Sequence, residues 1–324
     1  MATSHARQLS LFPQEKDSPV PSPDSQKQIT WSHSRRSTLE KCAYLYYLQY
    51  FGANKNTAKQ ERDKSTFHFL KRLRNRHLRI GKILHLMIAT YLRKLQEGDE
   101  WEVQRLASWA QDIFQKDIVY SRENPDGDNR SKERFPPTLL REYHYRLPNA
   151  DELCREAEEK LVYAVTSFVT DGIYDEFRFA GSRRSSLIEE KFSLSGKLYR
   201  ITGQIDLAYQ QDGTVSLVDW KLGGDDGTGD DSLQLAAYAL WAIQHFNCTP
   251  EALRVYKVHL STGEIVSFNA DANVIASARA RIEQDAERMM VLQRYGEQAI
   301  AEAFTRCLEP AICRQCVFER VCYA

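Results

Sequence analysis

The chain has 324 residues, of which 42% are hydrophobic and 27% are charged, a composition typical of a folded protein with one large domain or two small ones. Lys and Arg balance Asp and Glu at 44 each, so the net charge favours no polyanionic partner and any nucleic-acid contact must come from local patches. The sequence has no run of the roughly 20 apolar residues that a membrane span needs, and its polar N-terminus lacks the apolar run of a signal peptide. We therefore expect a cytoplasmic protein without a membrane partner.

The N-terminal part divides into a polar tail and a helical region. Residues 1–29 are rich in Ser, Pro, Gln and charge, which predicts a disordered tail because such a segment cannot bury enough apolar area to fold. After it, Ser37 or Thr38 is a candidate cap for a helix that runs to Tyr50, with apolar residues at helical spacing. We expect residues 30–96 to form the N-terminal helical part of the folded domain.

A second helical region is predicted for residues 66–96, around the basic run KRLRNRHLRIGK. This run fits phosphate binding and an exposed helix face equally well. Residues 97–180 are also predicted to be mostly helical, with a polar break at SRENPDGDNR, and nothing in them indicates chemistry. We interpret residues 97–180 as a helical insertion.

In residues 181–324 the hydrophobic pattern changes to the period of two that is typical of strands. The pair Asp212-Gly213 is a strong hairpin signal. Strands that alternate with helices are therefore expected here, followed by a cysteine-rich C-terminus. The predicted elements are strands at 186–195, 197–210 and 214–221, a helix at 233–245, strands over LRVYKVHL and EIVSFNA, and a helix at 271–296.

The stretch GQIDLAYQQDGTVSLVDWKLGG carries the strongest chemical signal, because it places Asp206 on one strand and Asp219 with Lys221 at the end of the next. Residues two apart in a strand project from the same face, and the hairpin brings Asp206 alongside Asp219 and Lys221. Carboxylate oxygens beside an open position suit Mg²⁺ or Mn²⁺, which polarises a phosphodiester and lowers the pKa of bound water. A nearby ammonium can orient that water or stabilise the charged transition state. These are the requirements of phosphodiester hydrolysis.

The same stretch resembles a known family in detail. Gly203-x-x-Asp206 followed by Val218-Asp219-Trp220-Lys221 is similar to the G-x-x-D and hydrophobic-(D/E)-x-K motifs of the RecB-type PD-(D/E)XK nuclease superfamily. The expected order of elements, with a helix, three strands, a helix and a strand, is also the order of that family's core. The resemblance implies an α/β nuclease fold, with a mixed sheet flanked by helices, and a metal-dependent nuclease activity.

Further motifs of the family occur in order along the chain. Gly81-Lys82-Ile83-Leu84-His85 resembles the helix whose His completes the metal shell, and Glu189 matches an acidic residue that precedes the hairpin. Glu190 is adjacent, and the strand phase could serve either residue. Downstream, Gln234 and Tyr238 match the Q-x-x-x-Y helix of the family, in which residues four apart share a face and can meet the substrate strand.

The resemblance implies a role for each of these residues. The implied metal ligands are His85, Asp206, Asp219 and the main-chain carbonyl of Trp220. The implied catalytic residues are Lys221, Asp206, Asp219 and Glu189, and the implied DNA-positioning residues are Gln234 and Tyr238. A solvated acidic loop or a mobile lid is expected after Lys221, where the sequence reads GGDDGTGDD.

Seven cysteines in a reducing compartment are not expected to form disulfides, and four of them lie within residues 307–322. Cys313-x-x-Cys316 and Cys322 form a C-terminal cluster that needs a fourth ligand, for which Cys42 is the candidate. The segment STLEKCAYLYYLQY and this spacing resemble the iron-sulfur branch of the family, found in CRISPR-associated RecB-like exonucleases and AddB-type nuclease domains. The resemblance implies a 4Fe-4S cluster on four thiolates.

Alternatives to this cluster stay open. A zinc site and reduced buried thiols are the structural alternatives, and Cys307 could replace Cys42 in a purely local site. The chain has Ala43 where family members often have Pro after the first cysteine, a departure from the pattern. A cluster would join Cys42 to the last dozen residues and so connect the two ends of the nuclease core.

The polar tail contains Gln8-Leu9-Ser10-Leu11-Phe12, which resembles the pentapeptide that binds the bacterial sliding clamp. A disordered tail can present Leu11 and Phe12 to an apolar pocket, with Gln8 hydrogen-bonded at its rim. The expected partner is a bacterial sliding clamp, and an incidental apolar cluster is the alternative.

We expect a DNA nuclease, acting as an exonuclease on ends or single strands, in DNA repair or in defence against phage or plasmid DNA. The chain lacks the P-loop G-x-x-x-x-G-K-[ST], so a helicase or a defence-complex subunit would be a separate chain. One alternative is a non-catalytic DNA-binding subunit of a repair, defence or CRISPR-adaptation complex. Another is a site-specific endonuclease, which shares the metal site.

Overall fold

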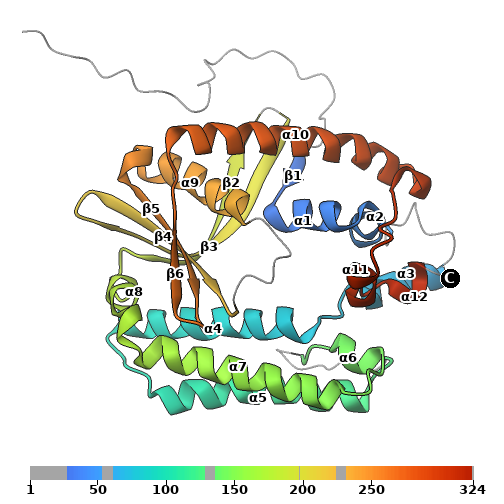
Figure 1. Ribbon diagram of the computed structural model, residues 1–324, viewed down its shortest axis with the longest axis horizontal. Coiled ribbons are helices and arrows are strands. Elements are labelled where there is room, and N and C mark those ends of the chain that lie inside the picture. Colours follow the sequence, from blue (N-terminus) through green and yellow to red (C-terminus); the bar gives the residue numbers. More distant parts are fainter. Residues whose placement is uncertain (1–27, 53–60, 128–135, 197, 224–230, 323–324) are drawn as a thin grey trace, which may run out of the picture.

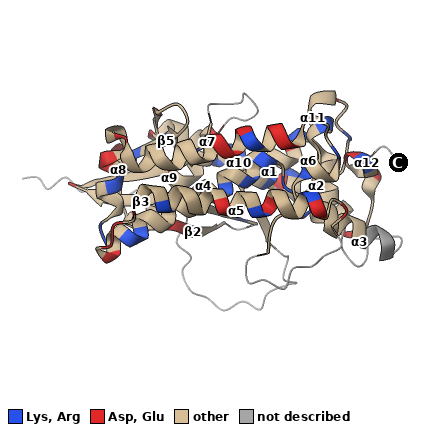
Figure 2. Cartoon of the chain, turned by 90° about the horizontal axis from the view of Figure 1, so that it is seen from below, with Lys and Arg blue, Asp and Glu red and all other residues tan. Residues whose placement is uncertain are grey.

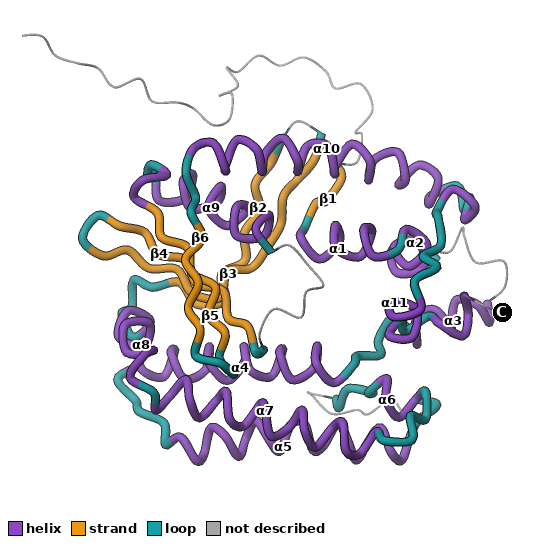
Figure 3. The backbone as a smooth tube through the Cα atoms, viewed as in Figure 1, coloured by secondary structure: helices purple, strands orange, loops and turns teal. Residues whose placement is uncertain are grey.

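The computed structural model describes residues 28–52, 61–127, 136–196, 198–223 and 231–322. A mixed sheet lies in the middle of the molecule, with helices on both of its faces (Figures 1 and 3). The strands are β1 (Ile29–Trp31), β2 (Leu187–Ser195), β3 (Tyr199–Gln211), β4 (Thr214–Lys221), β5 (Leu253–His259) and β6 (Glu264–Phe268). The α-helices are α1 (His33–Lys41), α2 (Ala43–Tyr50), α3 (Glu61–Leu70), α4 (Arg76–Glu97), α5 (Val103–Glu123), α6 (Arg141–His144), α7 (Ala150–Thr170), α8 (Asp175–Gly181), α9 (Ser232–Phe246), α10 (Ala272–Glu297), α11 (Pro310–Gln315) and α12 (Glu319–Cys322).

The long strand β3 organises the sheet. Along one of its edges it pairs antiparallel with β2. Along the other edge it pairs parallel with β1 at its beginning and antiparallel with β4 at its end. The sheet then continues from β4 to β5, which are parallel, and from β5 to β6, which are antiparallel. The edge of β3 between its β1 and β4 pairings therefore stays open within the sheet.

Two hydrophobic cores hold the layers together. One core lies between the sheet and the helices α1, α2, α9 and α10, with Trp31, Ile205 and Leu240 among its buried side chains. The other lies between the opposite face and the helices α4, α5, α7 and α8, with Phe168 and Trp220 among its members. Because successive residues of a strand point to opposite faces, the strands β3, β4 and β5 contribute side chains to both cores.

The predicted helical insertion forms a layer with α4, in which α5 packs against α7 and α7 against α4 (Figure 1). The predicted helical region of residues 66–96 consists of two helices, because residues 71–75 separate α3 from α4. Arg74 forms an isolated bridge with Leu140 there. Asn75 then caps α4, and Gly98 ends it with a φ of +83°. The division of the chain at residues 96 and 180 stays a prediction.

The first helix also differs from its prediction. The expected caps Ser37 and Thr38 lie inside α1, which begins four residues earlier with Ser32 as its cap. A single helix to Tyr50 was wrong, because Cys42 has an extended backbone that ends α1 and begins α2. The Cys42 Sγ accepts a hydrogen bond from the backbone N–H of Leu45 at 3.3 Å, so a thiol takes the capping role that Ser or Asp usually fills.

The predicted hairpin and strands of the core are confirmed. Asp212 and Gly213 have φ values of +50° and +78°, the left-handed conformations that a two-residue hairpin turn requires. Strand β1 was missed, because it is only three residues long and pairs with β3 far along the chain. The predicted tail is wrong at its end, since Ile29 is buried and begins this strand. The pentapeptide at residues 8–12 lies outside the described residues.

Within the described ranges, no helix combines the length and apolarity needed to cross a membrane. Figure 2 shows Lys and Arg interspersed with Asp and Glu along the helices seen from below. The balance differs between helices, because α10 carries four residues of each sign whereas α4 carries five Lys and Arg residues against one acidic residue, Glu97.

Candidate active site

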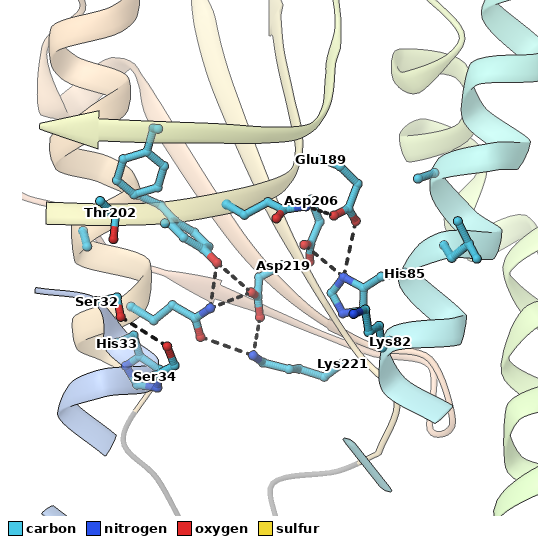
Figure 4. A pocket seen from close by; sticks show the side chains of 18 of the residues that line it. Ser32, His33, Ser34, Lys82, His85, Glu189, Thr202, Asp206, Asp219 and Lys221 are labelled. Atoms are coloured by element: carbon cyan, nitrogen blue, oxygen red, sulfur yellow. Dashed lines mark hydrogen bonds and ion pairs between the residues drawn. The ribbon is translucent and has the colours of Figure 1, made fainter. Parts of the chain in front are cut away.

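A cleft of about 600 Å³ opens beside the unpaired edge of β3. Its walls come from the first turn of α1, the middle of α4, the strands β2 to β4 and the start of α9 (Figure 4). The cleft brings together most of the residues that the sequence predicted for the site. They are His85, Glu189, Asp206, Asp219, Lys221, Gln234 and Tyr238.

The sheet register explains how three acidic residues come together. The β3–β4 ladder ends at Leu207 opposite Val218, so Asp206 and Asp219 occupy the next position, where the strands begin to separate. The β2–β3 ladder places Glu189 at the position opposite Asp206. Three carboxylates thus follow one another in one row across three strands.

Helix α4 places His85 against two of these carboxylates. The His85 Nδ1 lies 3.0 Å from Asp206 Oδ1 and 3.4 Å from Glu189 Oε1. Among the described residues these three form a group whose ligand atoms all lie within 4.8 Å of one another. Two carboxylates and an imidazole are donors that suit Mg²⁺ or Mn²⁺. The three side chains therefore fit a divalent metal ion.

The backbone of Glu189 is unusual for a strand residue. Its φ is +54°, a conformation that residues other than glycine rarely adopt. The pleat changes phase at this point, because Leu187 before it and Phe192 after it pack in the same hydrophobic core. Glu189 accepts a hydrogen bond from Gln204 and faces His85. Of the two adjacent glutamates, Glu189 is therefore the one that the structure places with His85 and Asp206.

Asp219 belongs to a second, adjoining group. Its Oδ2 lies 2.8 Å from Lys221 Nζ, and its Oδ1 accepts hydrogen bonds from Gln234 Nε2 at 3.2 Å and Tyr238 OH at 3.3 Å. Gln234 Oε1 also accepts a hydrogen bond from Lys221 Nζ at 3.2 Å. In this arrangement Asp219 is paired with the lysine, so binding a metal ion would require it to give up part of that contact.

The Trp220 peptide lies between the two groups. Its backbone N–H donates a 2.7 Å hydrogen bond to Asp206 Oδ2. The indole points to the opposite face of the sheet, into the core that the sheet forms with α4, α5, α7 and α8. There it packs edge-on against Phe168 and Phe177. The indole anchors this end of β4, and the peptide orients Asp206. The predicted role of the Trp220 carbonyl as a metal ligand stays a prediction.

Burial and mutual contact shift the pKa values of these groups. Burial raises the pKa of Asp206 to about 6, against the opposing effect of His85. Burial alone would lower the pKa of His85, but the Asp206 and Glu189 carboxylates raise it well above its ordinary value. Burial would likewise lower the pKa of Lys221, and the carboxylates of Asp219 and Asp231 raise it. His85 and Lys221 are therefore both protonated near neutral pH when no metal ion is bound.

Gly203, the glycine of the G-x-x-D motif, has a steric reason of its own. A Cβ at Gly203 would lie 2.5 Å from Phe192 Cε1. The Phe192 ring is 6% exposed and packs edge-on against Tyr238. Gly203 thus lets Phe192 support the tyrosine that contacts Asp219.

The cysteines predicted to bind a cluster meet at the opposite end of the molecule from β5 and β6. Cys42 lines one small apolar pocket together with Cys307, Cys313, Cys316 and Cys322. The pocket walls also include Leu45, Leu48, Ile312 and Phe318. The fold therefore brings the N-terminal cysteine next to the C-terminal ones, as the sequence motif implied.

Several backbone N–H groups point at these sulfurs. Cys42 Sγ accepts hydrogen bonds from Leu45 N and Cys307 N, both at 3.3 Å. Cys316 Sγ accepts one from Phe318 N at 3.4 Å. Burial raises the pKa of the Cys316 thiol to about 11, with smaller contributions from the neighbouring Cys42, Cys322 and Cys313 thiols. These cysteines are thus close enough to interact electrostatically.

Residues that the sequence motifs did not indicate also surround the site. Asp231, at the start of α9, lies near the ammonium groups of Lys221 and Lys257 and near the imidazole of His33. Burial would raise the pKa of Asp231, but these cations lower it. The link joins β4, β5, α1 and α9, which are far apart in the sequence, so no local spacing could reveal it.

Comparison with known proteins agrees with this geometry. A model of the PD-(D/E)XK nuclease superfamily matches residues 30–323. A search of the curated proteins found no match. The crystal structure of SSO0001 is 16% identical, with a TM-score of 0.30 over 65% of this chain and 94% of that chain. A candidate exonuclease from Eubacterium rectale is 14% identical, with a TM-score of 0.33 over 67% of this chain and 76% of that chain. TM-scores this low support no closer comparison, so the assignment rests on the family model. The chain belongs to the PD-(D/E)XK nuclease superfamily.

Proposed function

We propose that this protein is a Mg²⁺- or Mn²⁺-dependent deoxyribonuclease that hydrolyses phosphodiester bonds in the cleft. The observation that carries the proposal is the meeting of His85, Glu189 and Asp206 within 4.8 Å, beside an Asp219–Lys221 pair at 2.8 Å. A bound divalent ion would polarise the phosphodiester and lower the pKa of the attacking water. Asp206 and Asp219, with His85 and the Trp220 carbonyl, are the proposed ligands, and Glu189 supplements them.

Each polar side chain then has a role that its contacts support. The Lys221 ammonium contacts Asp219 and can hold the attacking water or stabilise the charge that develops on the phosphate. Gln234 contacts both Lys221 and Asp219, so it fixes the position of the lysine ammonium relative to the Asp219 carboxylate. Tyr238 donates a hydrogen bond to Asp219. Together with Gln234, it is proposed to position the DNA strand.

We propose further that the protein attacks DNA ends or single strands as an exonuclease. The cleft volume of about 600 Å³ is in the range of pockets that enclose a drug-sized ligand. A pocket of this size suits one or two nucleotides of a single strand better than an intact duplex. A role in DNA repair or in defence against phage or plasmid DNA fits such an activity.

A 4Fe-4S cluster held by Cys42, Cys313, Cys316 and Cys322 is proposed for the cysteine pocket. The N–H groups directed at the Cys42 and Cys316 sulfurs are of the kind that stabilise cluster thiolates. A tetrahedral zinc site on the same thiolates is the alternative.

The cluster proposal has a direct chemical test. Anaerobically purified protein should be brown and contain about four irons per chain. Cys42→Ser should remove the colour, whereas Cys307→Ser should keep it. Stoichiometric zinc without iron would reject the cluster, and the opposite behaviour of the two variants would move the fourth ligand to Cys307.

Recruitment to a bacterial sliding clamp through Gln8, Leu9, Ser10, Leu11 and Phe12 is proposed from the sequence motif. A peptide of residues 1–25 should bind the clamp at roughly micromolar strength, because few apolar atoms are buried and ordering the peptide opposes binding. Changing Leu11 and Phe12 together to Ala should abolish binding while cleavage of free DNA continues. Equal binding of the variant would show that the match is incidental.

Cleavage of end-labelled DNA tests the main proposal. Purified protein should degrade linear DNA with Mn²⁺ and should stop when the ion is chelated. Closed circular DNA should resist if ends are required, whereas cutting of circles would indicate an endonuclease. Asp219→Ala should lose orders of magnitude in rate while keeping its fold. Equal cleavage by this variant would reject the site.

A further inference from the structure

Asp231 is the meeting point of three positively chargeable side chains. Its Oδ2 lies 2.9 Å from Lys257 Nζ and 4.0 Å from Lys221 Nζ. Its Oδ1 lies 3.6 Å from His33 Nε2. These partners come from β5, β4 and α1, whereas Asp231 itself begins α9. One carboxylate therefore connects four elements around the cleft.

The position of Asp231 at a helix start does not explain its orientation. Aspartate at this position usually accepts a hydrogen bond from a backbone N–H of the first turn. Asp271 does this at the start of α10, where it accepts from Asn273 N and Val274 N. Asp231 makes no such hydrogen bond, and its backbone already has helical angles. Its carboxylate is turned to the lysines instead.

Lys257 contacts this carboxylate from the neighbouring strand β5. The parallel β4–β5 register pairs Lys257 with Asp219, so both side chains project from the face that α9 covers. Lys257 is 12% exposed, and it lies outside the group of residues that line the cleft. Asp231 is likewise not among the cleft-lining residues, so its contact with Lys257 lies outside the cleft itself.

We propose that Asp231 is a positioning residue for Lys221: it holds the lysine ammonium in place when Asp219 turns to a metal ion. The proposal rests on the metal-dependent nuclease function proposed above. Lys221 now lies between two carboxylates, at 2.8 Å from Asp219 and 4.0 Å from Asp231. Asp219 cannot give the same oxygen fully to both a metal ion and the lysine, so a second anionic partner must take over.

Two consequences follow for a protein that lacks this carboxylate. Lys221 would then depend on Asp219 alone and would compete with the metal ion for it, which weakens metal binding. Once the ion is bound, Lys221 would also lose its fixed place near the reacting phosphate. A displacement of about 1 Å in a catalytic group can lower a rate on the order of 100-fold.

The test compares Asp231→Asn with Asp231→Glu in the full-length protein, with Asp271→Asn as a control that also removes one charge at a helix start. We expect Asp231→Asn to lower kcat by about 10- to 100-fold, with little change in KM for DNA or in the melting temperature. Asp231→Glu should recover a large part of the loss. Asp271→Asn should leave kcat unchanged, because asparagine caps a helix about as well as aspartate.

Calorimetric titration with Mn²⁺ adds a measurement that does not depend on cleavage. Asp231→Asn should weaken Mn²⁺ binding several-fold, and this effect should vanish when Lys221 is also replaced by Met, because no ammonium then competes for Asp219. An unchanged kcat and Mn²⁺ affinity in Asp231→Asn would overturn the proposal. So would an equal loss in Asp231→Glu, or the same weakening in the Lys221→Met background. A wild-type protein that binds Mn²⁺ but cleaves no DNA would instead reject the nuclease function.

Discussion

Replacing Gly203 by Ala tests how the sheet supports the active site. The new Cβ would lie 2.5 Å from Phe192 Cε1 and 2.6 Å from its Cζ, whereas carbon atoms pack best at about 3.5–4.0 Å. The ring must therefore move by about 1 Å. It has little room, because it packs against Tyr238 and Trp241 with ring centroids 6.0 and 5.7 Å apart.

The magnitude follows from this overpacking. Forcing an extra methyl group into a packed core costs about 1–3 kcal/mol, which for a chain of this size lowers the melting temperature by roughly 1–5 °C. The displaced ring presses on Tyr238, whose hydroxyl donates to Asp219 at 3.3 Å. We therefore expect kcat to fall by about 10-fold as well, since Asp219 loses part of its support.

Thermal unfolding and Mn²⁺-dependent cleavage measure the two effects. Gly81→Ala is the matched control, because a Cβ there would meet nothing within 4 Å and Ala in a helix should add about 0.5–1 kcal/mol of stability. Phe192→Leu in the Gly203→Ala background should recover part of the loss by removing the clashing ring edge. If Gly203→Ala melts at or above the wild-type temperature, or if the two changes add independently, the steric explanation is wrong.

Three further predictions concern charge and the cysteine pocket. Asp117→Ala should destabilise the protein by about 3–5 kcal/mol, measured by urea unfolding, because it leaves the Arg79 guanidinium of α4 without its fully buried partner. The exposed ion pair between Arg155 and Glu159 should contribute less than about 1 kcal/mol. Binding of Mn²⁺ at pH 7 should release about one proton, because contact with Asp206 keeps His85 protonated in the metal-free protein. The release would be measured as a calorimetric heat that depends on the buffer, and the affinity for Mn²⁺ should rise with pH. Cys42→Ser should lower both the iron content and the melting temperature, and an unchanged value of either would contradict the cluster as a link between the chain ends.

Local sequence patterns predicted the parts of the site that depend on short spacing. The strand period placed Asp219 and Lys221 on one face, and the Asp212-Gly213 turn brought Asp206 beside them. The structure has these residues in one cleft. Such features could be predicted because a turn type and a pleat fix the relative positions of residues only a few places apart.

Features that depend on backbone irregularity or distant pairing could not be predicted. The choice between Glu189 and its neighbour depends on a single φ of +54° that shifts the pleat, and no residue preference signals a left-handed glutamate. The break at Cys42 depends on a thiol acting as a helix cap. The contact between Asp231 and Lys257 depends on the parallel register of β4 and β5, which the intervening helix sets.

The most direct test of the account is the rate at which the protein releases nucleotides from end-labelled linear DNA at saturating Mn²⁺, compared between wild type and Lys221→Met. This change keeps an unbranched side chain only one atom shorter and removes the ammonium that contacts Asp219 and Gln234. We predict a rate that falls by about 100-fold or more, with unchanged folding and with DNA binding retained. Equal rates for the two proteins, or cleavage by the wild type that persists after Mn²⁺ is chelated, would contradict the assignment of this cleft as a metal-dependent nuclease site.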